Sequence, residues 1–199
     1  MKSIDKTKKK FEEALFSLLK EQNYHDITVG AICLFAGKTK MTFYHYYKDK
    51  DDLLAKASIN LVNEEYGKEY EGIEASVSDP EEIEYLSLVA TYEWVAKHHS
   101  QIKNLLYKGE MLPLEIFKRA LFNNYSKYLT EVIDTGGYDV PSDYMSIFCF
   151  EGLYESSLYY AERLKNNPDK EKVREEIKKV CRLLAKAVVA LITPTVSAA

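Results

Sequence analysis

The chain has 199 residues, of which 46% are hydrophobic and 29% are charged, a balance typical of a soluble globular protein. Only 8 Gly and 5 Pro interrupt it, too few for a sandwich of many short strands, so long helices joined by brief turns are favoured. The formal net charge is −4, but residues 1–50 carry 10 Lys and Arg against 6 Asp and Glu, and such a basic segment before an acidic remainder suggests a polyanionic partner at one end.

The first fifty residues predict three helices. One is expected over residues 3–22, and a short one over residues 28–35 begins at Thr28, a good N-cap. Gly37 marks a turn, because glycine readily adopts a left-handed backbone conformation that other residues resist. The third helix is expected over residues 39–46. Two short helices around an Ala-Gly turn form the helix-turn-helix pattern.

The remaining sequence predicts six further helices, and therefore an all-α protein of about nine helices in total. The fourth is expected over residues 50–70 with Asp49 as its cap, followed by a loop through Gly72 and Pro80. The last five are expected at residues 81–97, 100–107, 114–135, 142–166 and 169–192. We place a domain boundary at residue 50, so that a three-helix domain precedes a larger helical domain.

The cysteines and the apolar segments bear on chemistry and location. Cys33, Cys149 and Cys181 lie far apart in apolar helical patterns, which predicts buried reduced thiols. Neither a zinc-ligand spacing, a catalytic constellation nor a Gly-rich phosphate loop is present, so we expect no cofactor, no metal site and no enzyme activity. No signal-peptide core and no run of 18 apolar residues occurs, so we expect a cytoplasmic protein without a membrane partner.

The segment from Ala36 to Leu54 has the most specific pattern in the chain. Its sequence is Ala-Gly-Lys-Thr-Lys-Met-Thr-Phe-Tyr-His-Tyr-Tyr-Lys-Asp-Lys-Asp-Asp-Leu-Leu. It resembles the DNA-binding signature of the tetracycline-repressor (TetR/AcrR) family, approximately A-G-V-S-x-x-T-F-Y-x-H-F-x-s-K-e-x-L, and the likeness covers about residues 5–55. Two residues depart from the usual form. Lys38 replaces a small apolar residue, and Tyr47 replaces the usual Phe.

The resemblance implies a set of side chains that contact DNA. Lys40, Thr42 and His45 are expected to face the major groove, where Lys donates to guanine and a Thr methyl meets a thymine methyl. Phe43 and Tyr47 are expected to anchor the third helix in the core. Contacts that hold the DNA backbone are expected from Thr28, Lys38, Thr39, Tyr44, Lys48 and Lys50.

The resemblance also implies an effector pocket and a dimer interface in the larger domain. Aromatic residues and a histidine are the candidate lining for a small apolar or aromatic effector, and plain helix packing is the alternative: Tyr92, Trp94, His98, Phe117, Phe122, Tyr125 and Tyr128. Apolar stripes on the last two expected helices fit a homodimer interface, and an intramolecular core is the alternative: Phe150, Leu153, Tyr154, Ser157, Leu158, Ala161, Val180, Leu184 and Val188.

Together these features imply a transcription regulator, with residues 1–50 as its helix-turn-helix DNA-binding domain and residues 51–199 as its effector-binding and dimerisation domain. We expect a repressor that binds a pseudo-palindromic operator of double-stranded DNA as a homodimer and is released by a small-molecule effector. The alternative is a helical small-molecule-binding protein with a vestigial DNA-binding head. The lysines of the first helix are either a solvated helix start or an arm along DNA: Lys6, Lys8, Lys9 and Lys10.

Overall fold

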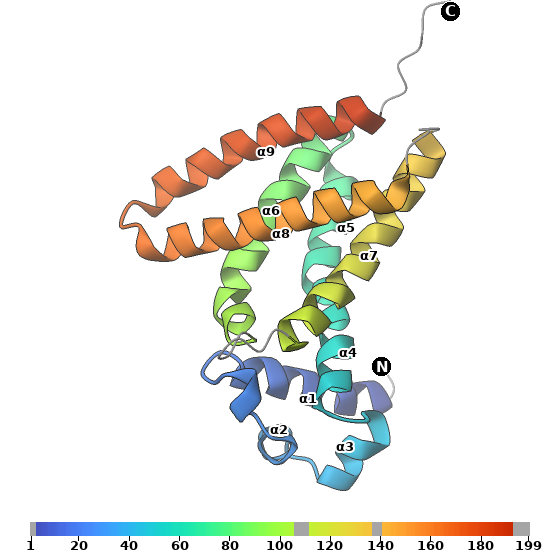
Figure 1. The fold of residues 1–199 in the computed structure, drawn as a ribbon, viewed down its shortest axis with the longest axis vertical. Coiled ribbons are helices and arrows are strands. Elements are labelled where there is room, and N and C mark those ends of the chain that lie inside the picture. Colours follow the sequence, from blue (N-terminus) through green and yellow to red (C-terminus); the bar gives the residue numbers. More distant parts are fainter. Residues whose placement is uncertain (1–2, 106–111, 137–140, 193–199) are drawn as a thin grey trace, which may run out of the picture. The chain divides into compact units, whose positions relative to one another are not determined.

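A computed structural model describes residues 3–105, 112–136 and 141–192, without the side chains of residues 3–5, 124, 127–129, 131–136 and 191–192. All regular elements of the described residues are helices, which confirms the expected all-α class (Figure 1). None of the described helices combines the length and the apolar character that a membrane span requires.

Packing divides the chain into two compact units. The first unit comprises residues 1–61 and 98–121, and the second comprises residues 62–97 and 122–199. The boundary expected from the sequence lies at residue 50, at the start of the expected fourth helix, and it stays a prediction. Residues 98–121 had not been expected to pack with the N-terminal helices, because they lie far from them in the sequence.

The helices of the first unit begin and end close to where the sequence predicts. They are α1 (Ser3–Leu18), a 3₁₀ turn (Tyr24–Asp26), α2 (Val29–Ala36), α3 (Lys40–Tyr46) and α4 (Lys50–Val62). Thr28 and Thr39 are N-caps, because each side-chain oxygen accepts the backbone N–H three residues later, at 3.1 and 3.2 Å. Gly37 ends α2 in the left-handed conformation, with φ 62°. Asp49 caps α4 by accepting the backbone N–H of Asp52 at 2.8 Å.

Aromatic rings form the centre of the first unit. Phe11 of α1 meets Phe43 of α3 edge to face, with ring centroids 5.4 Å apart, and meets Tyr47 in the same way at 6.1 Å. All three side chains are buried. The expected anchoring of the third helix by Phe43 and Tyr47 is therefore confirmed, and it sets which face of α3 points outward.

The middle of the chain is more continuous than the sequence predicts. α4 passes through a π-helical stretch (Asn63–Gly67) into α5 (Lys68–Ser76), so Gly72 lies in a helix and the expected loop is confined to residues 77–79, before Pro80. α6 (Pro80–Lys103) is one helix where two were expected. A single helical Gly costs only about 1 kcal/mol relative to Ala, and no Pro or Gly separates the two expected segments, so neither site stops the helix.

The second unit includes residues of α7 (Leu112–Gly136) and all of α8 (Ser142–Asn166) and α9 (Lys170–Ile192). α8 and α9 form an antiparallel hairpin (Figure 1), which an ion pair from Arg163 to Glu176 joins near its turn at 2.7 Å. The core gathers residues from α6, α8 and α9: Leu88, Tyr92, Tyr160, Val173, Cys181 and Ala185.

All three cysteines are free, as expected. Cys33 and Cys181 are buried, which confirms the prediction for these two, and Cys149 is half-buried. Burial raises the pKa of the Cys181 thiol to about 11, so this cysteine is protonated at neutral pH and acts as an apolar core residue.

Candidate nucleic-acid interface

α3 presents one well-defined face to solvent. Phe43 points into the core, and an α-helix turns by roughly 100° per residue, so the residues two positions away on either side point outward. These residues are Met41 and His45, and both are exposed. Lys40 and Tyr44 are exposed beside them. The outward face of α3 therefore mixes hydrogen-bonding groups with apolar surface.

Thr42 lies to the side of this face. Its side chain is half-buried, and its hydroxyl is 2.9 Å from the hydroxyl of the capping residue Thr39. Its backbone N–H donates to the same Thr39 oxygen. Of the three residues expected to contact base edges, Lys40 and His45 lie on the outward face, whereas Thr42 is partly engaged in the cap.

Lys40 also lies close to the first turn of α2. A Cβ placed on Gly30 would be 3.5 Å from Lys40 Cε and 3.5 Å from Thr28 Oγ1, so the lysine stem passes beside the start of α2. A Cβ at this position would meet the lysine stem at an ordinary van der Waals distance. The ammonium group of Lys40 and the exposed Thr28 hydroxyl thus lie near each other, as a shared contact with an anion requires. Lys38 is half-buried in the turn before α3, and Lys48 is exposed after it.

Lys50 corrects an expectation. Its ammonium group donates to the backbone oxygens of Tyr24 and Ile27, at 2.6 and 2.7 Å, and lies over the Tyr24 ring, 4.1 Å from its centroid. Burial lowers the pKa of Lys50. The sequence predicts a phosphate donor here, but the side chain points inward, where the carbonyl groups of Tyr24, at the start of the 3₁₀ turn, and Ile27, just after it, accept its hydrogen bonds. We therefore describe Lys50 as a positioning residue.

Tyr24 is the centre of a contact group that sequence reasoning missed. Its hydroxyl donates to Asp51 at 2.7 Å, and burial, followed by this hydrogen bond, raises the pKa of Tyr24. Its backbone N–H donates to the Asn104 carbonyl at 2.8 Å, and the Asn104 amide donates to the Leu19 carbonyl at 2.8 Å. These bonds hold the segment that leads into α2. Asn104 lies about eighty residues from its partners, so no local pattern could have indicated it.

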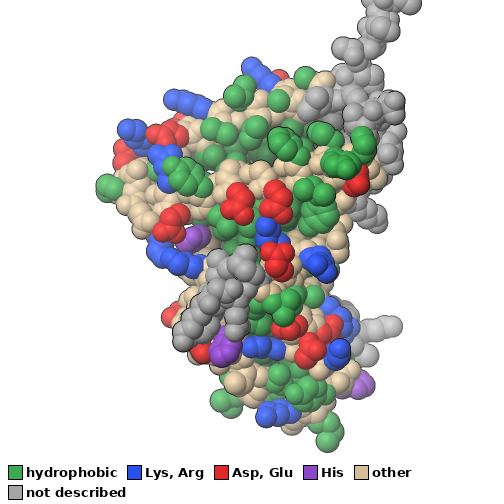
Figure 2. Space-filling model, in the orientation of Figure 1, with side chains coloured by type: hydrophobic (Ala, Val, Ile, Leu, Met, Phe, Trp, Pro, Cys, Tyr) green, Lys and Arg blue, Asp and Glu red, His purple; other side chains and the backbone are tan. Residues whose placement is uncertain are grey.

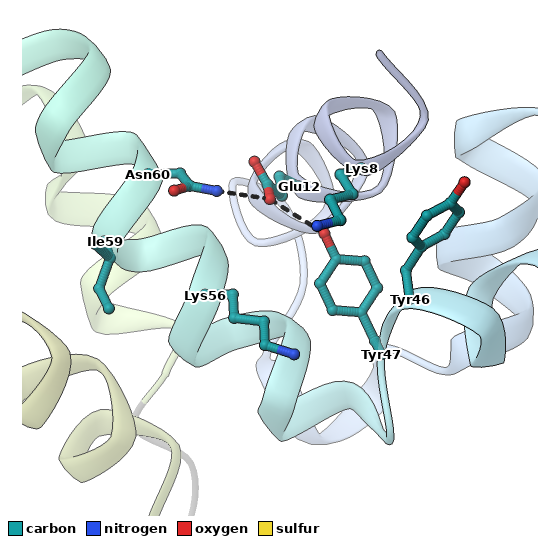
Figure 3. Close-up of a pocket in the computed structure, with 7 residues that line it drawn as sticks. All are labelled: Lys8, Glu12, Tyr46, Tyr47, Lys56, Ile59 and Asn60. Carbon is teal, nitrogen blue, oxygen red and sulfur yellow. Dashed lines mark hydrogen bonds between the residues drawn. The ribbon is translucent and has the colours of Figure 1, made fainter. Parts of the chain in front are cut away.

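A pocket of about 210 Å³ lies beside α3, lined by residues of α1, α4 and the end of α3 (Figure 3). Glu12 accepts hydrogen bonds there from the Tyr47 hydroxyl at 3.1 Å and from Asn60 at 2.9 Å. Lys56 pairs with Asp52 at 2.8 Å. Several polar groups of the pocket thus join the helices that hold α3, so we interpret these residues as a structural support of this interface.

The aromatic set expected to line an effector pocket is divided between the two units. His98 and Phe117 belong to the first unit and are buried there. The side chain of Tyr128 lies outside those that the structure describes. The other four residues belong to the second unit: Tyr92, Trp94, Phe122 and Tyr125. The seven residues are therefore not brought together in one compact unit.

Within the second unit, Phe122 and Tyr125 of this aromatic set lie near the polar side chains of Cys149 and Glu84. The rings of Phe122 and Tyr125 contact Phe150 at centroid distances of 5.4 and 5.9 Å. Burial raises the pKa of Cys149, and a hydrogen bond with Tyr125 lowers it in part. The Glu84 carboxyl acts on the same thiol, and burial raises the pKa of Glu84 as well. Apolar walls with a few polar groups are typical of small-molecule sites.

The stripes expected at a dimer interface are only partly at the surface. Four residues of α8 are buried in the chain's own core, which corrects the expectation for them: Phe150, Tyr154, Ser157 and Ala161. Leu153, Leu158 and Val188 are half-buried, while Val180 and Leu184 are exposed. α8 is apolar on more than one face, so the sequence alone does not show which face points inward.

The large exposed apolar side chains of α8 and α9 coincide only in part with the expected stripes. They are Tyr144, Ile147, Phe148, Tyr159, Val180, Leu183 and Leu184. Figure 2 shows hydrophobic side chains gathered over these two helices. The sequence patterns include Ile147, Phe148, Val180 and Leu184 in these stripes but miss Tyr144, Tyr159 and Leu183, although the spacing of Tyr144, Ile147 and Phe148 places them on one side of a helix.

Comparison with known proteins adds a family and a fold. Residues 13–57 match the model of the bacterial regulatory proteins of the tetR family. No curated protein matches the chain in sequence. A tetR-family transcriptional regulator from Syntrophomonas wolfei has a similar structure, with a TM-score of 0.66 and 18% identity over 92% of this chain and 96% of that one.

Two proteins named FadR are also similar in structure. The fatty acid degradation regulator FadR of Bacillus halodurans has a TM-score of 0.57 and 16% identity, over 96% of each chain. FadR of Bacillus subtilis, solved in complex with stearoyl-CoA, has a TM-score of 0.55 and 16% identity, over 94% of this chain and 98% of that one. At these identities the likeness shows the fold.

Proposed function

Because the chain belongs to the tetR family of bacterial regulatory proteins, we propose that it is a transcriptional repressor that binds operator DNA as a homodimer. α3 enters the major groove, which is wide enough to admit a helix. The observation that carries the proposal is the outward face of α3, where His45 is exposed opposite the buried Phe43 and Lys40 is exposed at the start of the helix. The proposal includes no catalytic step and places the protein in the cytoplasm.

The DNA contacts divide by chemistry. Lys40 and His45 contact base edges, because their donors lie on the outward face of α3. The hydroxyls and ammonium groups around that face, exposed except for the half-buried Lys38, contact phosphates and set the position of the helix: Thr28, Lys38, Thr39, Tyr44 and Lys48. The excess of Lys and Arg in residues 1–50 favours such contacts and makes binding sensitive to salt.

The homodimer forms through the exposed apolar side chains of α8 and α9. Phe148, which is 77% exposed, lies beside Ile147 on α8, and Leu183 is 69% exposed on α9. Large apolar side chains gathered on one surface are typical of protein interfaces. A two-fold axis brings identical surfaces together, so each dimer carries two copies of α3 and reads a pseudo-palindromic operator.

An effector binds in the second unit and releases the DNA. The apolar rings of Phe122 and Tyr125 beside Glu84 support a small apolar or aromatic ligand with a polar group. Stearoyl-CoA is the first compound to test, because a protein of similar fold was solved with it. Release requires that the effector bind the DNA-free form more tightly, and its extent equals that difference in affinity.

Selection of duplexes from a random-sequence pool tests the DNA-binding proposal. The expected result is an inverted-repeat consensus, bound with an affinity that falls steeply as salt rises. Lys40→Met is expected to lose most of this selectivity, whereas the matched control Lys20→Met, at an exposed lysine after α1, keeps it. A protein that selects no sequence but still binds stearoyl-CoA would instead support a small-molecule-binding protein with a vestigial head.

A further inference from the structure

Met41 is a strongly exposed apolar residue on the outward face of α3. Its side chain is 84% exposed, although methionine is usually found in protein cores. It lies two positions before Phe43, which is fully buried, so the helix directs it away from the core. A side chain so exposed contributes little to folding. Its position on the outward face of α3 leaves it accessible to a partner outside the chain.

The chemistry of the major groove limits what that partner is. A thioether side chain donates no hydrogen bond and accepts one only weakly, so it gains little from the donors and acceptors of the base edges. The C5-methyl group of thymine is the apolar group that the major groove offers. Methionine suits this contact, because its unbranched, polarisable chain adapts to the surface that it meets.

The neighbours of Met41 supply hydrogen-bonding groups rather than a freely exposed apolar one. Lys40 and His45 flank it with hydrogen-bonding groups, whereas the methyl-bearing Thr42 is half-buried and its hydroxyl is engaged with Thr39. The thymine contact that the sequence assigned to Thr42 is therefore better placed on Met41. We propose that Met41 is a specificity-determining residue that contacts the C5-methyl group of a thymine in each operator half-site. This inference rests on the proposed function and deepens it.

Deoxyuridine provides a direct test, because it removes the thymine methyl group and leaves the hydrogen-bonding edge unchanged. Each thymine of the selected operator is replaced in turn by deoxyuridine, and affinity is measured for the wild type and for Met41→Ala. In each half-site, one thymine is expected to be sensitive. Replacing that single thymine is expected to lower the operator affinity of the wild type about four-fold, as the loss of one buried methyl group predicts. The same replacement is expected to leave Met41→Ala unchanged, because its methyl contact is already absent.

Leu34→Ala is the matched control, since Leu34 is also 84% exposed but lies on α2. It is expected to keep the full wild-type penalty at the sensitive thymine. The inference is overturned if no replacement lowers the operator affinity of the wild type, or if the sensitive replacement lowers the affinity of Met41→Ala by the same factor. Sequence-selective binding without this coupling leaves the proposed repressor standing, whereas a failed selection overturns both.

Discussion

The exposed apolar side chains of α3 and those of α8 and α9 differ in what surrounds them. On α3, Met41 and Tyr44 lie among Lys40 and His45, so apolar area and hydrogen-bonding groups are interleaved. On α8 and α9, apolar side chains follow one another at helical spacing, with Phe148 among the most exposed. The first surface suits a partner that offers both acceptors and methyl groups, and the second suits another apolar surface.

The two surfaces are also held in place differently. The face of α3 is set by local bonds at Thr39 and by the burial of Phe43. In the second unit, long-range bonds hold the helices. Tyr92 meets Ser156 at 2.8 Å, and the Tyr160 hydroxyl donates to Glu93 at 2.6 Å. A recognition helix can therefore be identified from consecutive residues, whereas the exposed face of α8 depends on which helices cover its other sides.

The largest expected effect separates the two surfaces. Phe148→Glu places a charge in the proposed interface, so the dimer is expected to dissociate at micromolar concentration in sedimentation experiments. Operator affinity is expected to fall by about 100-fold or more, because the two half-sites are no longer bound by one particle. Ser78→Glu adds the same charge at an exposed position outside both helices and serves as the control. A Phe148→Glu protein that stays dimeric contradicts the interface.

The next effect divides the DNA contacts into two kinds. Lys40→Met is expected to reduce discrimination between operator and single-base variants by about tenfold or more. Lys48→Met is expected to weaken binding to all sequences alike and to reduce the slope of log affinity against log salt by about 1. Affinities measured on both sets of duplexes at several salt concentrations check this. Equal effects of the two variants on discrimination would contradict the assignment.

A smaller effect tests the inward position of Lys50. Lys50→Met leaves the carbonyl groups of Tyr24 and Ile27 without this donor, so the free energy of unfolding is expected to fall by about 1–3 kcal/mol in urea titrations. Lys48→Met, at an exposed lysine, is expected to change it by less than about 0.5 kcal/mol. If Lys50→Met lowers the salt slope of DNA binding and leaves stability unchanged, Lys50 is a phosphate donor after all.

The smallest expected effect concerns Glu84 in the second unit. Because burial raises the pKa of Glu84, the folded protein holds this proton more tightly than the unfolded chain does. The contribution is thus most favourable at acid pH and is lost as pH rises through the folded pKa. Glu84→Gln is expected to raise the free energy of unfolding at pH 7 by on the order of 1 kcal/mol. Urea titrations should show that gain disappearing near pH 4.

The caps show what local patterns can predict. Thr28, Thr39 and Asp49 each bond a backbone N–H three residues later, and Gly37 needs only its own backbone freedom. Such interactions close within one helical turn, so the sequence contains both partners side by side. The continuous helix through Gly72 shows the limit, because whether a helix stops at a weak breaker depends on its packing.

The sequence by itself determined the all-helical class, the helix-turn-helix and the two aromatic anchors of α3, because each depends on residues three or four positions apart. Only the tertiary structure decided that Lys50 points inward, that Met41 is exposed on the outward face of α3, and that Phe148 rather than Phe150 is exposed on α8. These outcomes depend on partners distant in sequence. A side chain's direction is set by what covers the rest of its helix, and that covering exists only in the folded chain.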